Sequence, residues 1–146
     1  MNAVQLAKTF FVAEHVGGAF YDRFSLNVDN QDVAGAFENF ARHEHEHARW
    51  YAEWLEARGE EVPYGPAYDF LVIPSLNLAL APQPLELKLR TFALTEAAAT
   101  RHLTDLAQKI RDPELRAIVE KTIPFERMHS RWYEAEGRRM LRRSDR

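Results

Sequence analysis

One pattern of residues occurs twice in the chain, 82 positions apart, and it restricts the possible folds more than any other feature. The segment 47–51 (His-Ala-Arg-Trp-Tyr) returns as the segment 129–133 (His-Ser-Arg-Trp-Tyr). In both copies a Glu stands three residues before the His, and another Glu stands 30 residues before that first one. The matching positions are Glu14, Glu44 and His47 in the first half and Glu96, Glu126 and His129 in the second. The chain is therefore predicted to consist of two related halves that carry the same side chains.

Apolar residues recur along four segments at alternating spacings of four and three, which is the pattern of a helix with one buried face. The predicted helices cover about 3–26, 31–58, 84–110 and 113–140. Asn30 and the pair Asp112-Pro113 mark two of the starts, because Asn and Asp cap helix N-termini and Pro fits the first turn. A short connection joins the two helices of each half, so we expect two antiparallel helix hairpins.

Residues 60–83 interrupt this pattern with prolines and a run of apolar residues, which predicts an extended connection and no helix. About two dozen residues can cross the full length of a helical bundle, which a short turn cannot. The predicted fold class is therefore all-α: an antiparallel four-helix bundle with a long crossover between helices 2 and 3. We expect residues 1–146 to form a single domain that ends in a basic tail, residues 141–146.

Each predicted helix carries a Glu in the middle of its apolar stripe. Buried carboxylates without compensating charge are costly, and four that converge on one core would repel each other or take up protons. The stripes contain no Lys or Arg beside these positions, so two divalent cations are the simplest source of positive charge. Four carboxylates and two imidazoles suit iron or manganese better than magnesium or calcium. Glu14 and Glu96 would each hold one metal, Glu44 and Glu126 would bridge the pair, and each His would take one.

With these motifs the sequence resembles the ferritin-like di-iron carboxylate superfamily, and the resemblance covers all four predicted helices. It implies two iron ions as the cofactor, with manganese as the alternative and zinc as a substitute that crystallisation can introduce. The ligands that it implies are Glu14, Glu44, His47, Glu96, Glu126 and His129.

The branches of this superfamily differ in features that a sequence can show. Storage ferritins generally lack the second Glu-x-x-His, and bacterioferritins usually have a longer chain with a fifth helix. Rubrerythrins have an aromatic residue seven positions after the first Glu, as Tyr21 is here, but they typically add a Glu where this chain has Ala99 and a cysteine-rich rubredoxin module. Demethoxyubiquinone hydroxylases use the same six ligands at a membrane surface, and the apolar stretch 70–81 keeps that alternative open.

Other residues near the six positions have two interpretations each. Tyr21, Tyr51 and Tyr133 are either core residues or hydrogen-bond and radical partners of the metals. The pair Gly17-Gly18 in mid-helix costs stability, so it indicates either a close approach of two helices or room for substrate beside Glu14. Pro124 deletes a backbone hydrogen bond inside the fourth helix and predicts a kink two residues before Glu126.

The function implied by the resemblance is that of a di-iron oxidoreductase acting on O2 or H2O2, of the peroxidase, oxidase or monooxygenase type. The chain has no cysteine and no visible flavin motif, so electrons would come from a separate donor or from the substrate. Two alternatives within the superfamily are a ferroxidase or iron-handling protein and a monooxygenase similar to the demethoxyubiquinone hydroxylases. A third is a metal-free helical interaction module whose buried Glu and His side chains bond to each other.

Composition limits the partners and the location. The formal net charge of −3 gives no reason to expect binding to nucleic acid or to an anionic membrane. The stretch 70–81 is too short to cross a bilayer, so we expect no membrane contact. The N-terminus lacks the layout of a signal peptide, which favours the cytoplasm. Helix-bundle surfaces often form dimers, and we expect a homodimer.

Overall fold

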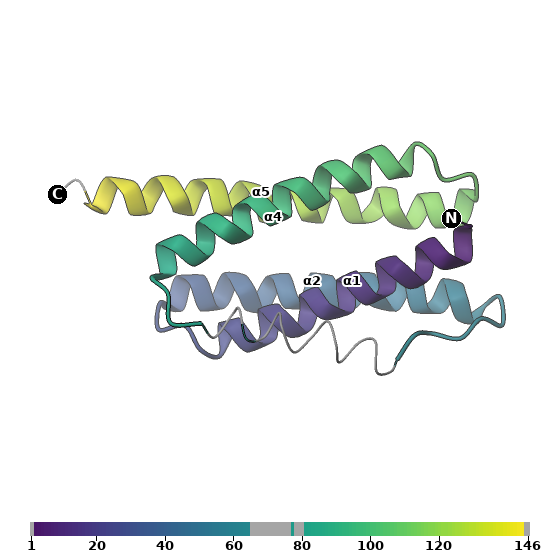
Figure 1. The fold of residues 1–146 in the computed structure, drawn as a ribbon, viewed down its shortest axis with the longest axis horizontal. Helices are drawn as coiled ribbons and strands as arrows, with labels where there is room; N and C mark the ends of the chain where they lie inside the picture. The colour runs from purple at the N-terminus through teal and green to yellow at the C-terminus, as the bar shows by residue number, and fades with distance from the viewer. Residues whose placement is uncertain (1, 65–76, 78–80, 145–146) are drawn as a thin grey trace. The chain divides into compact units, whose positions relative to one another are not determined.

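Four helices make up the architecture of the computed structural model, which describes residues 2–64, 77 and 81–144 (Figure 1). They are α1 (Ala3–Ser25), α2 (Gln31–Glu56), α4 (Leu85–Ala107) and α5 (Pro113–Ser144). No strand occurs among these described residues, so the predicted all-α, four-helix fold class is confirmed. None of the described helices has a stretch long and apolar enough to cross a membrane.

The chain divides into two compact units, Met1–Ala81 and Pro82–Arg146. α1 packs against α2 in the first unit, and α4 packs against α5 in the second. Each half of the sequence repeat therefore forms one helix hairpin (Figure 1). Most of the predicted crossover, residues 60–83, lies outside the described residues, so its path and the single domain stay predictions.

The helices of the first hairpin begin at side-chain caps. At the start of α1, Asn2 Oδ1 accepts a hydrogen bond from the Gln5 amide at 2.9 Å, and Gln5 Oε1 accepts one from the Asn2 amide at 3.2 Å. At the start of α2, Asn30 Oδ1 accepts from the amides of Asp32 and Val33, both at 3.1 Å. These bonds satisfy amides that have no carbonyl partner within the helix. The observed ends, at residues 25 and 56, lie one and two residues before the predicted ones.

α4 is shorter than its predicted range of 84–110. Pro84 occupies the N-cap, just outside the helix, and α4 ends at Ala107. The chain then tightens into a turn in which the Lys109 amide donates to the Leu106 carbonyl at 2.8 Å. Residues 108–112 then connect α4 to Pro113, where α5 begins.

α5 begins where the sequence predicts and extends further. Asp112 Oδ1 accepts from the Leu115 amide at 2.8 Å and caps the helix that starts at Pro113. The helix is continuous through Pro124 and includes residues 141–144, which the sequence assigns to the basic tail. Two arginines lie in this last turn, where positive charge interacts favourably with the helix dipole. The kink at Pro124 stays a prediction, and the last two residues lie outside the described part of the chain.

The core of the first hairpin is aromatic. Phe37 is fully buried, and its ring centroid lies 4.7 Å from that of Phe24 and 5.2 Å from that of Tyr21. Phe40 adds an edge contact to Tyr21 at 5.5 Å. The second hairpin buries mainly aliphatic side chains, among them Leu89, Leu115 and Val119. The charged side chains described next therefore lie on the same buried faces as these apolar residues.

Candidate metal centre

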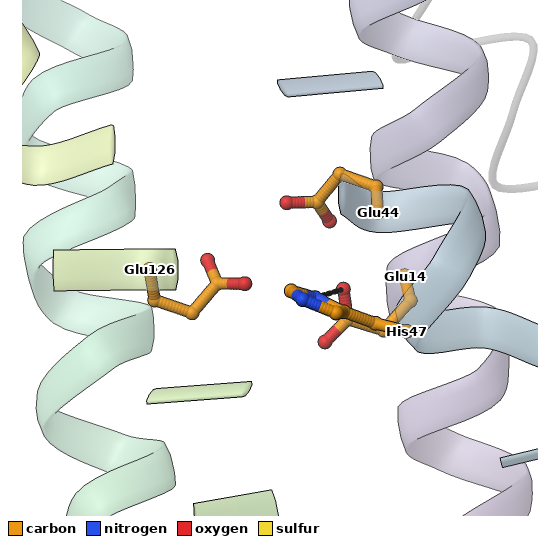
Figure 2. A group of neighbouring side chains, drawn as sticks. All are labelled: Glu14, Glu44, His47 and Glu126. Atoms are coloured by element: carbon orange, nitrogen blue, oxygen red, sulfur yellow. Dashed lines mark hydrogen bonds and ion pairs between the residues drawn. The ribbon is translucent and has the colours of Figure 1, made fainter. Parts of the chain in front are cut away.

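Three potential metal ligands meet inside the first hairpin. Glu14 comes from α1, whereas Glu44 and His47 come from α2, where a spacing of three residues puts both side chains on one helix face. His47 Nδ1 lies 3.2 Å from Glu14 Oε2 (Figure 2). One ligand atom from each of the three residues lies within 4.8 Å of the other two. His47 is fully buried and each Glu is only 6% exposed, so two buried carboxylates lie around one buried imidazole.

The second hairpin contains the equivalent group. Glu96 comes from α4, and Glu126 and His129 come from α5. His129 Nδ1 lies 2.8 Å from Glu96 Oε1 and 3.7 Å from Glu126 Oε2. His129 is fully buried and Glu126 is 5% exposed, while Glu96 is partly buried. The contact between the imidazole and the Glu of the neighbouring helix thus occurs in both hairpins, each time across 33 residues of sequence.

Each of these triplets has the composition and spacing of a metal site. A buried carboxylate needs a compensating charge. Within one triplet even a protonated His balances only one of the two carboxylates. A divalent cation would balance both carboxylates, and ligand atoms of the three residues of each triplet lie within 4.8 Å of one another. The residues of each hairpin therefore fit a bound divalent cation.

The three tyrosines that the sequence singles out lie in the hairpin cores. The Tyr21 ring packs among phenylalanines, and the centroid of the fully buried Tyr51 ring lies 5.4 Å from that of Phe10. The Tyr133 ring lies 5.3 Å from that of Trp132. These contacts give all three a packing role. Their role as hydrogen-bond or radical partners of the metals stays a prediction.

A polar cluster beside the first triplet is not predicted by the sequence. His45 Nε2 lies 2.7 Å from Asp22 Oδ2 and so links α2 to α1. The His15 ring centroid lies 6.4 Å from that of His45. Burial lowers the pKa of His15, and the nearby charge of His45 lowers it further. Both histidines directly follow a predicted ligand in the sequence, but that position alone does not reveal that they face each other.

Comparison with known proteins points to one family. A family model described as Rubrerythrin matches residues 7–137, a range that includes all six predicted ligands. No match is found among curated proteins or among solved structures. The chain departs from the usual rubrerythrin pattern at Ala99, where a further Glu is typical, and it contains no cysteine. On the extent of this match, the chain belongs to the rubrerythrin family and thereby to the ferritin-like di-iron carboxylate superfamily.

Proposed function

We propose that this protein is a di-metal oxidoreductase that acts on O2 or peroxide, with iron as the metal and manganese as the alternative. The observation that carries the proposal is the buried triplet of two carboxylates and one imidazole, present in both hairpins. In this proposal the hairpins pack as a ferritin-like bundle that brings both triplets to one centre. Four carboxylates then balance the four positive charges of two divalent metals, and this attraction offsets the cost of burying the carboxylates.

Each side chain has a task in the proposed centre. Glu14 and His47 would hold one metal, Glu96 and His129 would hold the other, and Glu44 and Glu126 would supply two further carboxylates. A carboxylate oxygen can only accept a hydrogen bond, so the Nδ1 that faces it carries the proton in the metal-free protein. Metal binding at Nδ1 displaces that proton. When bound, the metals would supply the redox chemistry.

The electron donor is proposed to be a separate protein or the substrate itself. The chain has no cysteine, so it cannot form the cysteine-ligated iron site of a rubredoxin module. A homodimer and a cytoplasmic location complete the proposal. The match to the rubrerythrin family supports the oxidoreductase over an iron-storing shell and over a membrane-associated hydroxylase.

The proposal can be tested by loading the protein with Fe(II) under anaerobic conditions and mixing it with O2 or H2O2 while iron absorbance is recorded. We expect oxidation of up to two irons per chain, turnover when a reductant is supplied, and a small oligomer by light scattering. His129→Ala should abolish the fast reaction, whereas His102→Ala, at an exposed position of α4, should leave it unchanged. Uptake of many irons per chain into a large shell would favour iron storage, and no reaction with either oxidant would refute the proposal.

A further inference from the structure

Gly17 of α1 packs against the carboxylate of Glu44. A Cβ atom added to Gly17 would lie 2.6 Å from Glu44 Oε2 and 3.3 Å from Glu44 Cδ, and real Cβ contacts essentially never fall below 3.0 Å. The space beside the Gly17 backbone is therefore filled by the Glu44 side chain. Of the two interpretations that the sequence offers for the Gly17-Gly18 pair, this contact supports a close approach of α1 and α2.

The contact is specific to this part of α1. Added Cβ atoms at Gly35 of α2 and Gly137 of α5 would meet nothing within 4 Å. At Gly18 an added Cβ would lie 2.6 Å from the ring of His45, the residue after Glu44. The side chains of two consecutive residues of α2 thus pack against two consecutive glycines of α1. We call Gly17 and Gly18 the glycine seat.

The second hairpin has no equivalent seat. The offset of 82 residues maps Gly17 onto Ala99 and Gly18 onto Thr100, both of which carry a Cβ. Ala99 is exposed, whereas Gly17 lies against the Glu44 carboxylate. The two halves therefore hold equivalent glutamates, Glu44 and Glu126, in different surroundings.

We propose that Gly17 is a positioning residue of the metal centre. Because it has no Cβ, the Glu44 carboxylate can rest against the backbone of α1, within 4.8 Å of the ligand atoms of Glu14 and His47. To restore an ordinary contact distance, an added Cβ must displace the carboxylate by close to 1 Å, more than the tolerance of about 0.5 Å for ligand geometry. The inference rests on the proposed function, because it concerns a ligand of the proposed metal centre.

The first test is anaerobic titration with Co(II), whose visible bands report the ligands around the ion. In Gly17→Ala we expect one of the two Co(II) ions to bind about 10- to 100-fold more weakly, the usual effect of losing support for a ligand, with a changed spectrum for that ion. Gly35→Ala is the matched control and should bind as the wild type does. Unchanged affinity and spectrum in Gly17→Ala would overturn the inference while leaving the proposed function intact.

The second test uses the metal-free protein, so it examines the contact between Gly17 and Glu44 independently of the proposed function. Gly35→Ala should raise the midpoint of thermal unfolding by about 1–4 °C, because Ala is the better helix former. Gly17→Ala should raise it less in the wild type, where the Glu44 side chain must move, than in a Glu44→Ala background, where that side chain is absent. The same rise in both backgrounds would overturn the seat, as would failure of the double variant to fold. Absence of Co(II) binding by the wild type would refute the proposed function, and this comparison would still test the seat.

Discussion

Replacement of Glu126 by Gln should change stability in opposite directions with and without metal. The side chain is 5% exposed, and His129 Nδ1 lies 3.7 Å from its carboxylate. Gln keeps the shape and removes the charge, so in the metal-free protein the variant avoids burying a carboxylate. We expect the free energy of unfolding of this variant to rise by about 1–3 kcal/mol.

With metal present the same variant should lose most of the stabilisation that one bound ion provides. At a free Mn(II) concentration near 1,000 times the dissociation constant, each bound ion stabilises the wild type by about 4.1 kcal/mol. For one ion that Glu126 holds, a ligand loss that weakens binding about 100-fold leaves about 1.4 kcal/mol at the same concentration. For a chain of this size, with about 2–4 °C per kcal/mol, the part of the midpoint shift that this ion causes falls from about 8–16 °C to about 3–6 °C.

The assay is thermal unfolding followed by circular dichroism, in chelator and in Mn(II). Glu134→Gln on the same helix is the control, since this side chain is exposed and should give the wild-type midpoint in both conditions. A Glu126→Gln protein that is less stable in chelator and keeps the full shift in Mn(II) would show that Glu126 is neither a buried charge nor a ligand.

Three further predictions concern the first hairpin. Phe37→Ala should lower the free energy of unfolding by about 3–5 kcal/mol in urea titration, because its fully buried ring leaves a cavity; a loss below about 1 kcal/mol would contradict the aromatic core. Asn30→Ala should cost about 1 kcal/mol by removing the cap of α2, and an unchanged urea midpoint would show that water replaces the cap. The pKa of His15 lies below its ordinary value of 6.5, so the unfolded chain binds this proton more readily. The contribution of neutral His15 to the free energy of unfolding is therefore complete above pH 6.5 and is lost as the pH falls below this value. The free energy of unfolding of the wild type and of His15→Gln should be measured in chelator at several pH values. The difference, wild type minus variant, should decrease on acidification, and a constant difference would contradict the lowered pKa.

Much of the helical structure follows from local signals in the sequence. Asn30 and Asp112 act as the caps that they predict, because a cap involves only the next three residues. The stripe spacing likewise places Glu44 and His47 on one face of α2. The repeat predicts that the other half does the same, and both imidazoles indeed face a Glu of the neighbouring helix.

Features that depend on the register between two helices could not be predicted in this way. Two contacts depend on how far α1 is shifted along α2: that of Glu44 with Gly17 and that of His45 with Asp22. The apolar stripes of the two helices do not specify this shift. The repeat is also misleading at this point, since Ala99 occupies the position equivalent to Gly17. Helix ends are similarly hard to predict: residues 141–143 are good helix formers without a stop signal, and α5 continues through them to Ser144.

Binding of one metal by each of the two triplets can be seen directly in an anomalous difference map from crystals of the iron-loaded protein. We expect two peaks per chain, one at about 2.0–2.2 Å from His47 Nδ1 and one at the same distance from His129 Nδ1. Iron absent from both histidines, or bound only at surface carboxylates, would refute the assignment of the triplets as metal ligands.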